Sequence, residues 1–235
     1  MWREGVRLYL GVDQSLTGTG VCLVDEDCKV VADGLLRPRK IRGVFRLDYI
    51  CSEIAKVADL VPACADFVSV REDYSFSSKG RAVFDLGELG GCVDLSFYRH
   101  RNGSWCSQRH YRIPPSTHKK FCLHNGAAQK GNTVAEKSLY LDLVEKMTGP
   151  RFNDDNTADA WMLARTIWAK DRCLQDSRFA ESLDPEEKEA LIPKRERDLR
   201  HLTLKRIGVL PSAEFQAVLA ATFDEAFMVF ERPEK

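Results

Sequence analysis

The fold is decided by Leu8-Tyr9-Leu10-Gly11-Val12-Asp13-Gln14-Ser15, an apolar run that ends on a single carboxylate. An apolar run of this length, followed by Ser, Thr and Gly, is typical of a buried strand. A charge at the end of such a strand is costly unless hydrogen bonds or a cation compensate it. Asp13 therefore either caps the turn at Ser15-Leu16-Thr17-Gly18 or holds a cation, and this stretch alone leaves both possibilities open.

The expected sheet has five strands, of which the first three are antiparallel. Residues 6–32 fit those three strands, with a tight turn at Asp25-Glu26-Asp27. The fourth strand, residues 66–70, runs into Arg71-Glu72 and so repeats the pattern of a buried strand that delivers a carboxylate. The fifth strand is expected over residues 108–113.

Helices are expected to flank this sheet. The apolar spacing and the capping signals predict them over residues 41–60 and 80–93, from residue 116, from a capping box at residues 133–136, and after Asn153-Asp154-Asp155. The fourth of these helices is expected to bury Tyr140, Leu143, Val144 and Met147. This order indicates an α/β domain with a mixed sheet over residues 1–170, followed by a charged, helical C-terminal extension over residues 171–235.

The composition restricts the class of protein. The 235 residues include 35 Lys and Arg and 35 Asp and Glu, so any affinity for nucleic acid must come from local patches. The eight cysteines form no Cys-x-x-Cys pair, which favours reduced, buried thiols in a reducing compartment. No signal peptide and no membrane span are expected, because the N-terminal apolar run is short and no uncharged apolar window approaches the length of a span.

Three carboxylates stand out: Asp13 after the first strand, Glu72 after the fourth, and Asp159 on the last helix of the domain. Asp159 lies four residues after Asp155 and three after Asn156, and both spacings put the side-chain oxygens on one helix face. Concentrated carboxylates repel unless a hard cation neutralises them, and oxygen ligands select Mg²⁺ or Mn²⁺. Two such ions can activate water and stabilise the leaving oxygen of a phosphodiester.

Other residues leave alternatives open. Asn153 or Asp154 can simply cap the last helix of the domain. Lys137 is either solvated or bound to an anion at the start of its helix. Tyr74 and Phe76 are either sheet core or wedges between bases. A zinc site has too little support, because no known ligand pattern matches the spacing of His110, His118, His124, Cys106 and Cys122.

Six motifs follow one another along residues 6–170: Gly11-Val12-Asp13-Gln14-Ser15-Leu16-Thr17-Gly18-Thr19-Gly20, Glu72 at a strand end, Gly87-Glu88-Leu89-Gly90-Gly91, Pro114-Pro115-Ser116-Thr117-His118-Lys119-Lys120-Phe121, Ala135-Glu136-Lys137-Ser138 and Asp155-Asn156-Thr157-Ala158-Asp159-Ala160. In this order they resemble the RuvC family of Holliday-junction resolvases, within the RNase H-like superfamily, and more narrowly the resolvases of bacteriophages. The resemblance implies an RNase H-like sheet and a Mg²⁺-dependent endodeoxyribonuclease with two ions per active site. It also implies a homodimer on four-way DNA, in which each subunit nicks one strand.

The resemblance assigns roles to individual residues. It makes Asp13, Glu72 and Asp159 metal ligands, and it places Lys119 and Lys137 beside the scissile phosphate. The family usually has Asp, and sometimes His, three residues before its last catalytic Asp. This chain has Asn156 there and Asp155 one residue earlier, so either of the two can complete the site. The expected DNA-binding residues are Tyr74, Phe76, Lys79, Lys119, Lys120, Lys130 and Lys137.

Two other functions fit parts of the sequence. A junction-binding protein with weak or no cleavage is possible if Asn156 replaces an essential ligand. An actin-like or sugar-kinase-like ATPase also begins with an Asp and a Thr/Gly turn, but no second Asp-Gly-Thr hairpin follows. The nuclease hypothesis places the protein in the cytoplasm of a bacterial or phage-infected cell. In the extension, residues 194–206 carry six Lys and Arg against two acids, and this segment either packs as a solvated helix or touches the DNA arms.

Overall fold

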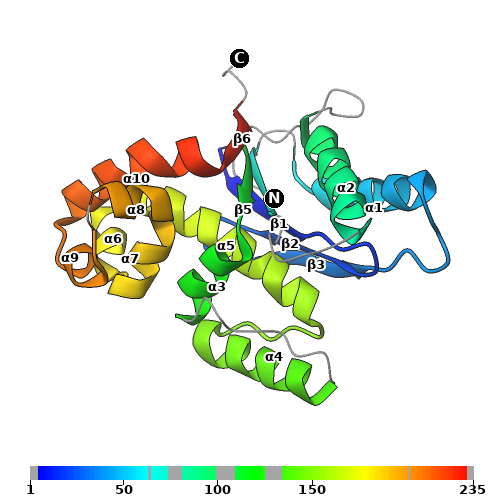
Figure 1. The fold of residues 1–235 in the computed structure, drawn as a ribbon, viewed down its shortest axis with the longest axis horizontal. Helices are drawn as coiled ribbons and strands as arrows, with labels where there is room; N and C mark the ends of the chain where they lie inside the picture. The colour runs from blue at the N-terminus through cyan, green and yellow to red at the C-terminus, as the bar shows by residue number, and fades with distance from the viewer. Residues whose placement is uncertain are drawn as a thin grey trace.

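The computed structural model describes residues 5–62, 65–73, 81–98, 109–124, 134–200 and 202–231, with the backbone alone for residues 81, 82, 134, 135, 199, 230 and 231. Its centre is a six-stranded mixed sheet of order β3-β2-β1-β4-β5-β6 (Figure 1). The strands are β1 (Arg7–Asp13), β2 (Thr19–Val24), β3 (Val30–Leu36), β4 (Asp66–Glu72), β5 (Arg109–Ile113) and β6 (Met228–Glu231).

The pairing of the strands is that of an RNase H-like sheet. β2 is antiparallel to β1 and β3, whereas β4 is parallel to both β1 and β5. The predicted fold class is therefore confirmed. The predicted number of five strands was wrong, because the C-terminal segment adds β6 antiparallel to β5 at the edge of the sheet.

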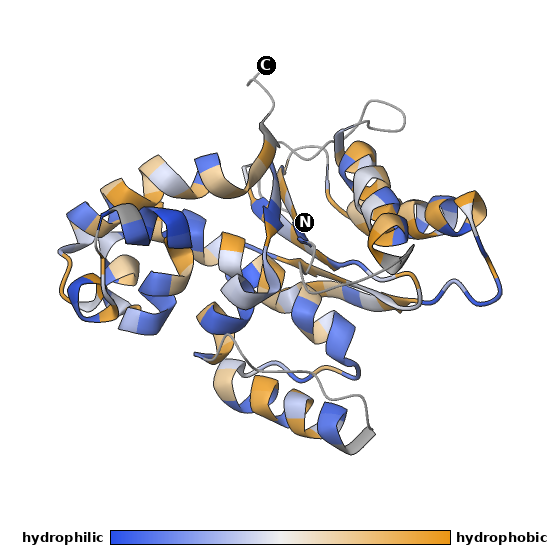
Figure 2. Ribbon diagram, in the orientation of Figure 1, coloured by the Kyte–Doolittle hydropathy of each residue, from blue (hydrophilic) through white to orange (hydrophobic). Residues whose placement is uncertain are grey.

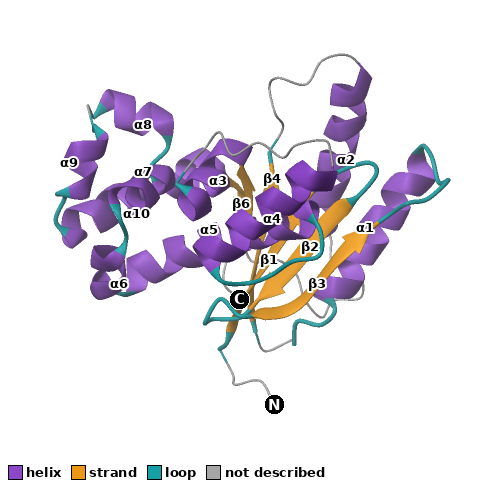
Figure 3. Ribbon diagram, turned by 90° about the horizontal axis from the view of Figure 1, so that it is seen from below, coloured by secondary structure: helices purple, strands orange, loops and turns teal. Residues whose placement is uncertain are grey.

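Different helices cover the two faces of the sheet. α1 (Val44–Ala58) and α2 (Arg81–Tyr98) lie on one side, and α3 (Pro115–Leu123), α4 (Val134–Thr148) and α5 (Asp155–Gln175) lie on the other (Figures 1 and 3). Because side chains alternate along a strand, Leu8 and Leu10 of β1 enter the core under α1 and α2, and Tyr9 enters the core under α5. The same alternation directs Asp13 to the side of α5.

Two glycines allow α5 to lie against the backbone of the sheet. A Cβ atom on Gly11 would come within 1.9 Å of the Ala160 carbonyl oxygen, and one on Gly20 within 2.1 Å of the Asn156 carbonyl oxygen. Neither contact leaves room for any side chain at positions 11 and 20. The first two turns of α5 therefore rest directly on β1 and β2, which places Asp155, Asn156 and Asp159 beside the end of β1.

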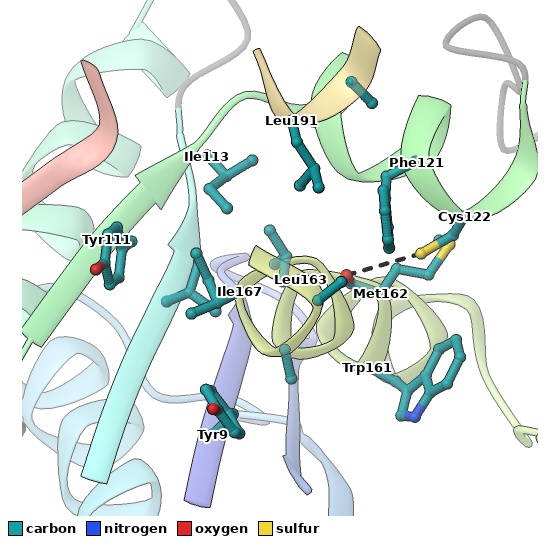
Figure 4. Packing of buried hydrophobic residues seen from close by; sticks show 14 of the residues in the cluster. Tyr9, Tyr111, Ile113, Phe121, Cys122, Trp161, Met162, Leu163, Ile167 and Leu191 are labelled. Atoms are coloured by element: carbon teal, nitrogen blue, oxygen red, sulfur yellow. Dashed lines mark hydrogen bonds between the residues drawn. The ribbon is translucent and has the colours of Figure 1, made fainter. Parts of the chain in front are cut away.

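The C-terminal segment is built into the core under α5. Its elements are α6 (Ser177–Ser182), α7 (Pro185–Leu191), α8 (Lys194–Leu199), α9 (Leu204–Gly208), α10 (Ser212–Phe227) and β6. Leu191 of α7 shares one buried cluster with Ile113, Phe121 and Leu163 (Figure 4). The expected helical character of this extension is confirmed. Its treatment as a separate unit from residue 171 stays a prediction, although its side chains share a core with the sheet.

A buried lysine ties α5 to the C-terminal segment. Lys170 is 1% exposed, and its Nζ atom lies 2.7 Å from an Asp224 carboxylate oxygen of α10 and 3.2 Å from the Tyr111 hydroxyl of β5. α5 itself continues to Gln175, beyond residue 170, where the α/β domain is predicted to end. Lys170 thus links α5, β5 and α10 at the predicted boundary.

The fourth predicted helix, α4, buries a narrower stripe than its spacing indicated. Tyr140 and Val144 are buried, whereas Leu143 and Met147 are 36% and 38% exposed. The prediction of a four-residue buried stripe was therefore half right. The reason is that, among the described elements, α4 packs mainly on α3 and α5 (Figure 1).

The cysteines of the described residues carry free thiols, of which those at positions 22, 122 and 173 are buried, as predicted, and those at positions 28, 51 and 92 are half-buried. Burial raises the pKa of Cys122 to about 12, so this thiol stays protonated at neutral pH. Cys64 and Cys106 lie outside the described residues. Among the helices that are described, none combines the length and the apolar character that a membrane crossing requires.

Gly11→Ala is expected to destabilise the protein strongly, because the new methyl group would meet backbone atoms of α5 that cannot move aside separately. We expect the free energy of unfolding to fall by about 3 kcal/mol or more, the upper end for overpacked cores. Gly34→Ala is the matched control, since its Cβ would lie 3.8 Å from Val21 and should change stability by less than about 1 kcal/mol. Urea unfolding measures both values, and equal stabilities would contradict the direct contact of α5 with β1.

Candidate active site

The site begins with two carboxylates at the ends of neighbouring parallel strands. Asp13 ends β1 and Glu72 ends β4, and the register pairs Val12 with Arg71, the residues just before them. Because side chains alternate along a strand, both acids fall on the α5 face of the sheet, as do Tyr9 on β1 and Val70 on β4. Asp13 is 5% exposed and the Glu72 side chain is 20% exposed, so the two acids are largely withdrawn from water.

The turn after Asp13 is held by other residues. The Thr19 hydroxyl donates to the Ser15 carbonyl oxygen at 2.7 Å, and the Ser15 amide donates to the Thr19 hydroxyl oxygen at 3.2 Å. Ser15 and Thr19 thus stabilise the turn that Asp13 was expected to cap in one of the two alternatives. Asp13 lies on the side of α5, and its role as a metal ligand stays a prediction.

α5 and α3 complete a compact group around Glu72. Asp159 is 1% exposed, His118 is fully buried, and one ligand atom from each of Glu72, His118 and Asp159 lies within 4.8 Å of the others. The His118 Nε2 atom is 3.8 Å from Glu72 Oε1. The sequence predicts Glu72 and Asp159 as ligands, but it does not predict His118 as their neighbour. His118 lies in the Pro114–Phe121 motif, in which only the lysines are predicted site residues.

Asp159 is surrounded by groups that stabilise its charge. The Tyr140 hydroxyl donates a hydrogen bond to Asp159 Oδ1, and Lys119 Nζ lies 3.9 Å from Asp159 Oδ2 and 5.8 Å from the centre of the Tyr140 ring. Burial raises the pKa of Tyr140, and the charges of Asp159 and Asp13 raise it further. Tyr140 therefore remains a neutral donor that orients Asp159.

The start of α5 separates the roles of three neighbouring residues. Asp154 is the N-cap, since its side chain accepts a hydrogen bond from the Thr157 amide at 2.8 Å. Asp155 is 6% exposed, and its Oδ1 lies 3.2 Å from Lys137 Nζ of α4. The Asn156 amide faces the β1–β2 turn, where a Cβ on Gly18 would lie 3.2 Å from its Nδ2 atom. Asp155 and Asn156 thus face different neighbours, α4 and the β1–β2 turn.

The donor set fits a hard divalent cation. Asp13, Glu72, Asp155 and Asp159 bring four carboxylates to the ends of β1 and β4, with Lys119 beside Asp159 and Lys137 beside Asp155. Several largely buried carboxylates close together are costly without a counter-ion. Oxygen donors suit Mg²⁺, and the addition of an imidazole is compatible with Mn²⁺.

The other histidines considered for zinc have different partners. His110 is buried against Ser69 and Asp94, and His124 Nε2 lies 3.0 Å from Asp184. Asp184 and Glu187 form a second possible ligand group with His124, but these two acids already build the capping box of α7. His118 lies instead with Glu72 and Asp159, so the histidines do not converge on one zinc site.

The remaining predicted DNA-binding residues are placed unevenly. Lys120 Nζ lies 2.5 Å from Glu189 of α7, so in this conformation a carboxylate of the C-terminal segment occupies it. Glu189 also pairs with Arg197 of α8. Tyr74, Phe76, Lys79 and Lys130 lie outside the described residues, and their expected roles stay predictions.

The basic segment of the extension is less open than its sequence suggested. The described side chains of α8, residues 194–198, are hydrophilic (Figure 2), but Lys194 pairs with Asp198 at 2.7 Å and Arg200 with Glu196 at 3.5 Å. Exposed ion pairs of this kind are weak, and a phosphate can displace them. Contact of this segment with DNA stays a prediction.

No protein-family model matches the chain, and no curated protein matches it in sequence. Among solved structures, it is similar to Thermus thermophilus RuvC in complex with Holliday junction substrate, with 13% identity, a TM-score of 0.49, and coverage of 67% of this chain and 90% of that chain. A second structure of Thermus thermophilus RuvC gives 14% identity, a TM-score of 0.47 and the same coverage of 67% and 90%. At this identity the likeness concerns the fold alone.

His118→Gln is expected to weaken the binding of a divalent cation, because it removes the imidazole beside Glu72 and Asp159. Partners around a metal site change its affinity by about 10- to 100-fold, and we expect a loss of roughly ten-fold for Mn²⁺, measured by calorimetric titration. His124→Gln is the control for the second ligand group and should leave that affinity unchanged. If only His124→Gln weakens binding, the ion sits at α7 and His118 has no part in it.

Proposed function

We propose that this chain is a metal-dependent, structure-selective endonuclease that resolves four-way DNA junctions by paired nicks. The observation that carries the proposal is the meeting of Glu72, Asp159 and His118 within 4.8 Å at the edge of the sheet where Asp13 ends β1. A largely buried group of acids at this edge, with Lys119 at 3.9 Å from Asp159, suits the hydrolysis of a phosphodiester.

Asp13, Glu72 and Asp159 would hold two Mg²⁺ or Mn²⁺ ions, together with Asp155 or Asn156. When bound, such ions activate water and stabilise the charge on the leaving oxygen. The phosphate of the substrate would help to balance the charge of a second ion, so the full site is expected to form with DNA.

The chain's own side chains orient these groups. Tyr140 fixes one oxygen of Asp159 by a hydrogen bond, which leaves the other oxygen turned toward Lys119. Lys119 and Lys137 each stand beside a carboxylate of the site, and each ammonium group can hold a phosphate oxygen there. Burial of Asp159 at 1% exposure excludes water that would otherwise screen these charges.

Selectivity for branched DNA and action as a homodimer are supported by the ordered motifs of the sequence. Paired nicks on a symmetric junction need two sites, and a two-fold dimer supplies them. The proposal places the protein in the cytoplasm of a bacterial or phage-infected cell, with four-way DNA as its main partner.

A junction-binding protein with weak or no cleavage is the second candidate. It is favoured by Asn156, a neutral residue at a position where the RuvC family usually has an acid. The nearby Asp155 weakens this case, because it brings a buried carboxylate to the start of α5. An ATPase of the actin or sugar-kinase type would need a second lobe, and the described part of the chain contains one sheet.

Asp13→Asn, Glu72→Gln and Asp159→Asn are each expected to reduce nicking of a synthetic four-way junction by at least about a hundred-fold. The loss of a residue that only supports a ligand costs about 10- to 100-fold, so the loss of a ligand itself should cost more. Junction binding should remain largely intact, because Lys and Arg contacts to phosphates carry the affinity. Nicking and gel-shift assays in Mg²⁺ measure the two effects.

Glu53→Gln is the matched control for these variants, since Glu53 lies on α1, away from the site, and pairs with Lys56 at the surface. It should nick at the wild-type rate. Near wild-type nicking by a folded site variant would remove that residue from the site. Full nicking in excess chelator would contradict the metal requirement altogether.

Asp155→Asn is expected to damage nicking more than Asn156→Ala, because Asp155 offers the anionic oxygen that a second cation needs. We expect the difference to be roughly ten-fold or more in rate at limiting Mg²⁺, and to narrow as the Mg²⁺ concentration rises. A larger loss for Asn156→Ala would assign the ligand role to Asn156 and leave Asp155 as the partner of Lys137.

A further inference from the structure

A second buried polar cluster lies on the opposite face of the sheet, directly behind Glu72. Its centre is the Asp94 carboxylate of α2, and we name it the Asp94 cluster. Arg71 of β4 is fully buried, and it donates to Asp94 through Nε at 2.5 Å and through Nη2 at 3.0 Å. The other members are Ser69, His110 and Arg112.

Hydrogen bonds from two strands converge on this carboxylate. His110 Nε2 lies 2.9 Å from Asp94 Oδ1, and Arg112 Nη2 lies 2.6 Å from Asp94 Oδ2. Burial lowers the pKa of His110, so the imidazole is neutral at pH 7 and donates through Nε2, while its Nδ1 accepts from the Ser69 hydroxyl at 2.7 Å. Burial alone would raise the pKa of Asp94. Hydrogen bonds from His110 and Arg71 outweigh that effect, so the pKa lies below its usual value and the carboxylate stays charged.

The order Ser69, His110, Asp94 is that of a hydrolase triad, but it cannot act as one here. The Ser69 side chain is 0% exposed and His110 is 0% exposed, so a substrate has no access to the hydroxyl. The function of the cluster must therefore be sought in what it holds in place.

What it holds is the end of β4. Arg71 and Glu72 are consecutive, so their side chains leave opposite faces of the sheet, Arg71 toward α2 and Glu72 toward α5. The third nitrogen of the guanidinium, Nη1, donates to the Glu72 carbonyl oxygen at 2.9 Å. One side chain thus joins the backbone of Glu72 to Asp94, and through Asp94 to α2 and β5.

We propose that the Asp94 cluster is a positioning device for Glu72, and that Asp94 and Arg71 act on metal binding through that residue. This inference rests on the proposed metal role of Glu72. Side chains of two strands, β4 and β5, bind the Asp94 carboxylate of one helix, α2. These contacts restrict how the end of β4 can move. A ligand held by such a support loses less conformational freedom when it binds an ion.

The same sheet contains a matched cluster at its other end. Asp171 of α5 is 3% exposed and accepts from Arg7 at 3.0 Å, from Arg109 at 3.1 Å and from the Tyr9 hydroxyl at 3.3 Å. It is also a buried carboxylate between two arginines and a further donor. No member of this cluster is adjacent in sequence to a candidate ligand, so its loss should affect stability alone.

The experiment compares Asp94→Asn with Asp171→Asn in the full-length protein. Mn²⁺ affinity is measured by calorimetric titration, and stability by thermal unfolding. We expect both variants to lower the melting temperature, and Asp94→Asn alone to weaken Mn²⁺ binding by roughly ten-fold. Excess Mn²⁺ should restore nicking to Asp94→Asn, because Glu72 is still present.

A double-mutant cycle with Glu72→Gln tests the route of the effect. If Asp94 acts through Glu72, Asp94→Asn should not weaken Mn²⁺ binding further once Glu72 is replaced. Arg71→Lys serves where Asp94→Asn does not fold, since lysine keeps the charge but loses the two-point contact. It is expected to lower Mn²⁺ affinity in the same direction.

Equal effects of Asp94→Asn and Asp171→Asn on Mn²⁺ affinity would overturn the inference and make the Asp94 cluster a stability element. The inference would also be overturned if Asp94→Asn weakens Mn²⁺ binding as much in the Glu72→Gln variant as in the wild-type protein. If Glu72→Gln itself leaves Mn²⁺ affinity unchanged, the proposed metal role of Glu72 fails first, and the positioning role falls with it.

Discussion

The structure depends on the close contact between the backbone of α5 and the backbones of β1 and β2. Gly11 and Gly20 remove the side chains that would hold the helix away, and the Ala160 and Asn156 carbonyl oxygens occupy the space that Cβ atoms would need. A helix normally packs on a sheet through its side chains, so this contact brings α5 closer than usual to the strands. That proximity brings Asp159 into the same small region as Glu72, whose strand ends beside Asp13.

The second constraint is electrostatic, because acids gathered in a buried place need compensation from every side. On the α5 face Lys119, Lys137 and Tyr140 surround the carboxylates. On the α2 face Arg71 and Arg112 neutralise Asp94. Because buried ion pairs often contribute little net stability, their presence at the end of β4 that carries Glu72 is better explained by geometry than by stability. The sheet thus separates two sets of charges, the candidate-site acids on the α5 face and the Asp94 cluster on the α2 face.

The sequence predicted those parts of the fold that local patterns determine. Strands β1, β2 and β4, the turn after β2 and the carboxylates at strand ends follow from apolar runs and their boundaries. β6 was missed because it pairs with β5 across more than a hundred residues, and a four-residue strand carries no periodicity of its own. His118 was missed as a neighbour of Glu72 because α3 and β4 meet only in the folded chain. The exposed Leu143 and Met147 show that a helical stripe specifies a face, whereas the breadth of that face depends on the neighbour.

The C-terminal segment shows why sequence composition did not reveal its place in the fold. Its charges predicted a helical extension in which residues 194–206 form a solvated helix or touch DNA, whereas they gave no sign that Phe215, Leu219 and Phe223 of α10 are fully buried. The buried Lys170 pairs with the half-buried Asp224 and so joins α5 to α10, and Glu189 pairs with both Lys120 and Arg197. Lys120 follows Lys119 directly, so α7 and α8 stand next to the segment that carries a lysine of the site. Under the proposed function, DNA that reaches Lys120 must therefore compete with Glu189, and the charge of the C-terminal segment would then affect how tightly a phosphate is held there.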